Sequence, residues 1–122
     1  MIELLLGGGR ASDIHARLAG ERKSWHAPHL IEVEVGHVLR RLNLSRQLTD
    51  LRGRQALQDM SALGLCLHAH SPLLPRVWAL RANLSAYDAM YVALAEGLRG
   101  PLLTLDKRLA RATGHLASVE VF

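Results

Sequence analysis

Two aspartates stand in apolar stretches of the sequence, where burial makes a negative charge costly. Asp88 is the only formal charge between Arg81 and Glu96, and Asp106 closes the apolar run "PLLTL". A carboxylate in such surroundings must be protonated, paired or bound to a cation. Both have a structural alternative, because Ser85 and Asp88 have the spacing of a capping box and Asp106 suits the N-cap of the turn "KRLA". For Asp88 both interpretations stay open, whereas Asp106 taken alone favours the cap.

A third acid, Glu34, lies inside an apolar helical stripe between Leu30 and Val38, its neighbours four residues away on either side. Glu34, Asp88 and Asp106 come from three separate elements, and like charges repel one another unless a cation sits among them. Ligand sets made only of oxygen select a hard divalent cation such as Mg²⁺ or Mn²⁺. We therefore predict that these three acids converge on one metal site.

The elements that must position these acids follow from hydrophobic periodicity. We expect helices over residues 3–6, 11–21, 29–44, 45–64, 72–83 and 85–100, and a shorter helical segment over 106–114. Ser45 is the expected N-cap of the fourth helix and Gly64 its stop. Strands are expected at 24–28, 65–69, 101–105 and 118–122. This alternation predicts an α/β domain with a mostly parallel sheet, whose chemistry gathers at the carboxyl ends of the strands, where Asp106 follows one directly.

Other kinds of site have weaker support in the sequence. The seven histidines are scattered, and the pair His68 and His70 has strand spacing but no cysteine or acid at ligand spacing, which argues against zinc. The stretch "GGGR" follows a helix end and lacks the lysine of a phosphate-binding loop.

Composition describes one ordinary globular domain spanning residues 1–122. The chain is 49% apolar and 21% charged, and no apolar run has the roughly 20 residues of a membrane span. The single cysteine, Cys66, excludes an internal disulfide, so we expect a cytoplasmic protein with Cys66 buried. The net charge is +4, and nearly all of the positive charge comes from arginine, which suits the phosphates of a nucleic acid and an acidic protein partner equally well.

Three segments taken together are informative: "APHLIEVEVGHVLRRL", "PLLPRVWALRANLSAYDAMYVALAEGL" and "PLLTLDKRLARATG". They resemble the PIN-domain ribonucleases of the VapC toxin family, and the similarity runs from residue 3 to the C-terminus in the expected order. The resemblance implies a three-layer α/β/α sandwich, acids clustered around Mg²⁺ or Mn²⁺, cleavage of RNA phosphodiester bonds and neutralisation by a VapB-type antitoxin. It also implies a homodimer. Glu34, Asp88 and Asp106 match three family acids, and Ser85 replaces the usual threonine while keeping its hydroxyl.

The chain departs from the family at its beginning. Family members open with a strand that ends in an aspartate, in a pattern like "VVDAS", whereas this chain starts inside the helix that follows. We therefore expect a domain truncated at its N-terminus, without the first strand and the first acid. A start site placed too far downstream and a genuinely truncated product are both open explanations, and the codons upstream of Met1 would separate them.

The sequence hypothesis is a metal-dependent endoribonuclease toxin. Glu34, Asp88 and Asp106 would hold the metal, while Arg108, Ser85 and either Arg40 or Arg41 are candidates for contacting the RNA backbone.

The main alternative is a catalytically impaired PIN-like module that binds the antitoxin or RNA without cleavage. In that case Trp78, Tyr87 and Tyr91 would be contact or core residues, and their helical placement favours the core. A DNA-binding adaptor has little support, because no recognition-helix pattern or concentrated basic face is present.

Overall fold

The computed structural model describes residues 25–121, which form two compact units. Residues 31–66, with 25 and 26, belong to the first unit, and residues 27–30 and 67–121 belong to the second. The helices expected over 3–6 and 11–21, and the expected loss of an opening strand, lie outside the described residues.

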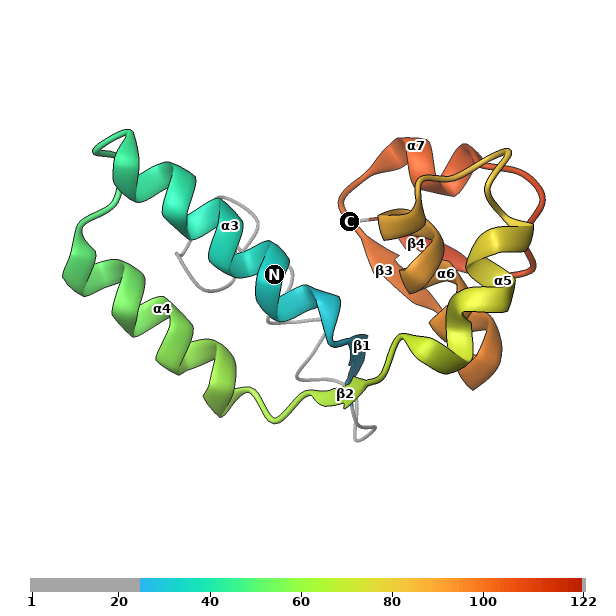
Figure 1. Ribbon diagram of the computed structural model, residues 1–122, viewed down its shortest axis with the longest axis horizontal. Helices are drawn as coiled ribbons and strands as arrows, with labels where there is room; N and C mark the ends of the chain where they lie inside the picture. The colour runs from blue at the N-terminus through green and yellow to red at the C-terminus, as the bar shows by residue number, and fades with distance from the viewer. Residues whose placement is uncertain (1–24, 122) are drawn as a thin grey trace. The chain divides into compact units, whose positions relative to one another are not determined.

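The first unit is built on a helical hairpin. Helix α3 (Leu30–Leu44) and helix α4 (Asp50–Ala62) run antiparallel, side by side (Figure 1). Their facing side chains form one hydrophobic cluster of Val35, Leu39, Ala56 and Met60, all buried. The apolar stripe that predicted a helix over 29–44 is therefore the stripe that packs.

The start of α4 differs from the prediction. Thr49 is the N-cap, and its hydroxyl accepts a hydrogen bond of 3.2 Å from the backbone N–H of Arg52. Ser45 instead finishes the preceding helix, because its hydroxyl donates to the carbonyl of Leu42. Arg46 then adopts a left-handed backbone conformation (φ 63°), which stops the chain from continuing as helix. The predicted stop is confirmed, since Gly64 has φ 68° just after α4 ends.

Two short strands pair where the chain passes between the two units. Strand β1 (His26–Pro28) and strand β2 (Cys66–His68) form a two-stranded sheet, close to the expected positions. The prediction for Cys66 is wrong, because this residue is exposed. Successive side chains in a strand point to opposite faces, so an apolar sequence context does not bury every member of it.

The second unit carries the longest apolar helix and the parallel strands. Its elements are a 3₁₀ turn η1 (Ser71–Leu73), helices α5 (Leu74–Ala79), α6 (Ala86–Leu98) and α7 (Lys107–Arg111), and strands β3 (Leu102–Thr104) and β4 (Val119–Val121). Strand β3 pairs parallel with β4, with Leu103 opposite Glu120. Helix α6 packs against α5 and β3, and α7 packs against β4 (Figure 1).

The core of this unit centres on α6. Its buried cluster is Val77, Leu80, Ala89, Met90, Val92, Ala93 and Leu109. Helix α6 is apolar around most of its circumference because it is buried on several sides. The predicted α/β class with parallel strands is confirmed.

The helix expected over 72–83 is shorter than predicted, and its aromatic residue is not in the core. Helix α5 ends at Ala79, and Trp78 is 69% exposed. The guanidinium of Arg81 lies 4.5 Å from the centroid of the Trp78 ring and covers part of it. Tyr87 is also exposed, at 63%, so the expectation that these two aromatics are core residues is wrong.

A half-buried ion pair ties the segment after α7 to the two helices before it. Arg76 on α5 donates to both carboxylate oxygens of Glu96 on α6, at 2.7 and 3.1 Å. The backbone N–H of Leu116 donates to the same carboxylate at 2.8 Å, and Arg76 also donates to the carbonyl of Gly114. Glu96 therefore holds together three parts of the unit.

Among residues 25–121, no helix is long and apolar enough to cross a membrane.

Candidate active site

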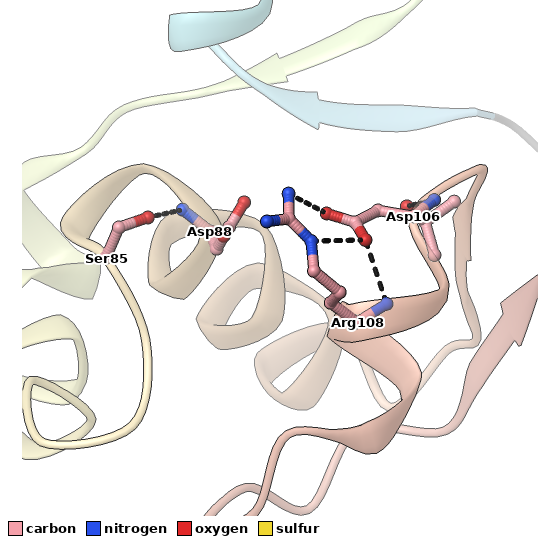
Figure 2. A network of polar contacts seen from close by, with 5 residues as sticks. Ser85, Asp88, Asp106 and Arg108 are labelled. Carbon is pink, nitrogen blue, oxygen red and sulfur yellow. Dashed lines mark hydrogen bonds and ion pairs between the residues drawn. The ribbon is translucent and has the colours of Figure 1, made fainter.

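Asp88 lies in the first turn of α6, exposed at the end of the helix that Ser85 caps. The hydroxyl of Ser85 accepts a hydrogen bond of 3.2 Å from the backbone N–H of Asp88 (Figure 2). This bond confirms Ser85 as the N-cap. This bond is one half of the capping box that the spacing of Ser85 and Asp88 predicted, and it satisfies the backbone N–H of Asp88.

Asp106 stands between strand β3 and helix α7 and caps that helix. Its Oδ1 atom accepts a hydrogen bond of 2.8 Å from the backbone N–H of Arg108, and its own N–H donates to the hydroxyl of Thr104 at 3.0 Å. The predicted N-cap is therefore confirmed. Because both bonds fix the backbone around Asp106, its carboxylate is held at the carboxyl end of β3, where an α/β fold places its chemistry.

The side chain of Arg108 donates hydrogen bonds to the same carboxylate. Its Nε and one terminal nitrogen each lie 3.3 Å from an oxygen of Asp106. The hydrogen bonds from the Arg108 side chain are the largest cause that lowers the pKa of Asp106 below its usual value, and the hydrogen bond from the Arg108 backbone N–H is the second. Asp106 is therefore an anion at neutral pH.

Asp88, in helix α6, and Asp106, the N-cap residue of helix α7, face one guanidinium. Figure 2 shows the Arg108 guanidinium between the carboxylates of Asp88 on α6 and Asp106 beside α7. The pKa of Arg108 is raised above its usual value, chiefly by the hydrogen bond to Asp106 and also by the charge of Asp88. The fold thus brings together two acids that are separated by 18 positions in the sequence.

The donor chemistry of this place fits a hard divalent cation. Both acids offer carboxylate oxygens, the ligands that Mg²⁺ and Mn²⁺ prefer, and a cationic group already lies between them. Within residues 25–121 no group of three or more His, Cys, Asp or Glu side chains is arranged to hold a metal ion. Two of the three predicted ligands, Asp88 and Asp106, thus lie on either side of the Arg108 guanidinium, and their role as metal ligands stays a prediction.

Comparison with known proteins decides the family. The PIN-domain family model matches residues 1–114 of the chain, which span both units. The chain belongs to the PIN-domain family. Several curated relatives carry the name VapC. This chain is 44% identical over 115 residues to ribonuclease VapC1 of Mycobacterium tuberculosis, and the match covers 93% of this chain and 86% of the relative.

Two further relatives from the same organism agree with this placement. Ribonuclease VapC9 is 44% identical over 106 residues, covering 87% of this chain and 80% of the relative. Ribonuclease VapC12 is 34% identical over 120 residues, covering 98% and 92%. The predicted membership of the VapC family of PIN domains is confirmed.

Glu34, the third predicted ligand of this PIN domain, belongs to the first unit. It is half-buried on α3, directly before buried Val35, in agreement with its expected place in an apolar stripe. Asp88 and Asp106 belong to the second unit. The role of Glu34 beside them stays a prediction. Arg40 and Arg41 are both exposed on α3.

One residue with a structural role was missed by reasoning from the sequence. The Nε2 atom of His70 accepts a hydrogen bond of 2.9 Å from the backbone N–H of Leu30, the first residue of α3. His70 thereby satisfies one of the unpaired donors at the start of that helix, across 40 positions of sequence. No local sequence pattern predicts a cap from a residue so far away, and the only available signal was the strand spacing of His68 and His70.

Proposed function

We propose that this PIN domain is a metal-dependent endoribonuclease, the toxin of a toxin–antitoxin pair. The observation that carries the proposal is the approach of Asp88 and Asp106 to one cationic group at the carboxyl end of β3. Membership of the family, and relatives that bear the name ribonuclease, support RNA as the substrate.

Asp88, Asp106 and Glu34 are the residues that would hold Mg²⁺ or Mn²⁺. When bound, such a cation supplies an acidified water and neutralises charge on the phosphate that is cut. Asp106 is suited to this role because it is already ionised and its backbone is fixed on both sides. We further propose that both units together form the one domain that carries this site, which the span of the family match supports.

Arg108 and Ser85 are the proposed contacts for the RNA backbone near the two aspartates. The guanidinium of Arg108 has a forked set of donors that matches a phosphate, and its side chain is 91% exposed. The Ser85 hydroxyl accepts one hydrogen bond from the backbone and retains its own proton to donate. Arg40 or Arg41 would add a second, less specific contact.

Cleavage of RNA by the wild-type chain and by Asp88→Asn tests the proposal. In the presence of Mg²⁺ or Mn²⁺ we expect the wild-type chain to cut RNA, and Asp88→Asn to lose at least about a hundredfold in rate, as removal of a charged group at a reacting centre typically costs. Asp59→Asn is the matched control, because Asp59 is an exposed acid on α4 in the first unit. Equal rates for Asp88→Asn and Asp59→Asn would remove Asp88 from the mechanism.

The proposed partners are a VapB-type antitoxin and a second copy of the chain, in the cytoplasm.

One observation favours the second candidate function, a binding module that does not cleave. Trp78 and Tyr87 are both largely exposed, and exposed aromatic residues are typical of protein interfaces. A wild-type chain that binds its antitoxin and leaves RNA intact with either metal would support this module over the enzyme.

A further inference from the structure

Arg108 is held at the aspartate pair by contacts that are easily broken. Its side chain is 91% exposed, and both of its side-chain bonds to Asp106 are 3.3 Å long. Exposed ion pairs of this kind contribute little stability, because water competes for both partners. The guanidinium is therefore a loosely held cation.

The helix does not depend on this ion pair. Helix α7 begins with the bond between the Asp106 Oδ1 atom and the backbone N–H of Arg108, which is shorter, at 2.8 Å, than the side-chain contacts. If the guanidinium moves away, this cap remains. The side chain of Arg108 is thus able to leave without unfolding the element that carries it.

The guanidinium and a divalent cation compete for the same oxygens. Arg108 takes hydrogen-bonding positions on both oxygens of Asp106 and faces Asp88 from the other side (Figure 2). Two cations close together repel each other, and each carboxylate oxygen has only two lone pairs. Occupation by one cation therefore disfavours the other.

We propose that Arg108 is an internal counter-cation, which partly neutralises the Asp88–Asp106 pair in the metal-free protein and is displaced when a divalent cation binds. This rests on the proposed function, since it takes the two aspartates as metal ligands. Once displaced, the guanidinium is available to the RNA phosphate. Arg108 is then a positioning residue that sets how tightly the site holds its metal.

Metal affinity without RNA tests this displacement. Titration calorimetry with Mn²⁺ should give Arg108→Gln a dissociation constant about two- to fivefold lower than the wild type, the range expected on removing an exposed competing ion pair. Arg111→Gln is the control, because Arg111 is a cation on the same helix and its loss removes the same formal charge. An equal dissociation constant in Arg108→Gln and Arg111→Gln, or weaker binding in Arg108→Gln, overturns the proposal.

Asp88→Asn separates this inference from the proposed function. If Asp88→Asn weakens Mn²⁺ binding and Arg108→Gln does not strengthen it, the metal site stands and the counter-cation role falls. If the wild-type chain binds no Mn²⁺, or Asp88→Asn binds it as well as the wild type does, both fall.

A second readout is the Nε–H resonance of Arg108 in a titration with Mg²⁺. It should shift as the metal binds while that of Arg111 stays in place, and an unmoved Arg108 resonance at saturation also overturns displacement.

Discussion

At the residue scale, the two aspartates of the candidate site contribute differently to the helix ends beside them. The hydroxyl of Ser85 caps α6, and the carboxylate of Asp88 in the first turn of that helix faces Arg108. Asp106 differs, because its Oδ1 atom caps α7 while the same carboxylate pairs with Arg108. Substitution of Ser85 should therefore affect stability chiefly through the helix, whereas substitution of Asp106 changes the helix and the site together.

Ser85→Ala should destabilise the protein by about 1 kcal/mol, because it removes the acceptor for the N–H of Asp88 at the start of α6. Ser85→Thr keeps a hydroxyl at the same place and should unfold close to the wild type. Chemical denaturation in metal-free buffer measures both. If Ser85→Thr and Ser85→Ala lose the same free energy of unfolding, the hydroxyl is not what stabilises the helix start.

At the scale of elements, the ion pair of Arg76 and Glu96 fastens the segment between α7 and β4 to helices α5 and α6. The Glu96 side chain is only 13% exposed and accepts hydrogen bonds from Arg76 and from the backbone of Leu116. Since β4 follows this segment and pairs with β3, the same carboxylate indirectly fixes the strand that precedes Asp106.

Glu96→Gln should therefore destabilise the second unit, by about 1 to 2 kcal/mol for the weakened hydrogen bonds of a charged group whose partner is partly exposed. Thermal unfolding at neutral pH checks this value. Asp59→Asn removes an exposed acid elsewhere and should leave the unfolding temperature nearly unchanged. A Glu96→Gln protein as stable as Asp59→Asn would show that the ion pair adds nothing.

The same ion pair predicts a pH dependence with a definite sign. Arg76, and after it the N–H of Leu116, holds the pKa of Glu96 below its usual value of 4.5. Because the folded pKa lies below the unfolded one, the stabilisation is complete above about pH 4.5 and is lost as the pH falls through the folded pKa. The stability difference between wild type and Glu96→Gln should therefore shrink on acidification below about pH 4.5. A difference that stays constant down to about pH 3 would contradict this assignment.

At the scale of the whole molecule, arginine gives the chain a net charge of +4 that suits a polyanionic substrate. The charge is spread along the sequence, so the two aspartates of the site lie within a positively charged protein and do not repel RNA as they would alone. Affinity for RNA should accordingly depend on salt more than on base sequence.

We expect the logarithm of the RNA association constant to fall linearly with the logarithm of salt concentration, measured in an Asp88→Asn background so that the RNA stays intact. Changing both Arg40 and Arg41 to Gln, so that whichever of them contacts the RNA is removed, should make the slope less steep by roughly 0.7, the value for one phosphate that is no longer neutralised on a single strand. Arg54→Gln is the control, because Arg54 is already paired with Asp50 at 3.0 Å. If the double variant keeps the slope of the control, Arg40 and Arg41 do not bind the RNA backbone.

Sequence patterns located the main elements because their signals are local. The apolar stripe from 29 to 44, the run before Asp106 and the serine before "AYDA" each specify a helix, a strand or a cap through neighbours within about four residues. Where two local signals competed, the sequence was misleading. Ser45 and Thr49 are both good N-caps, and the left-handed turn at Arg46 decides for Thr49.

By itself, then, the sequence determined the family and the α/β class, and it singled out Asp88 and Asp106 as candidate site residues, since these inferences depend on residue types and short spacings. Only the tertiary structure decided that Arg108 faces both aspartates, that His70 caps a helix 40 positions away, and that Cys66, Trp78 and Tyr87 are exposed. These contacts depend on which elements pack against each other, and burial and ion pairing are properties of that packing, which no spacing along the chain specifies.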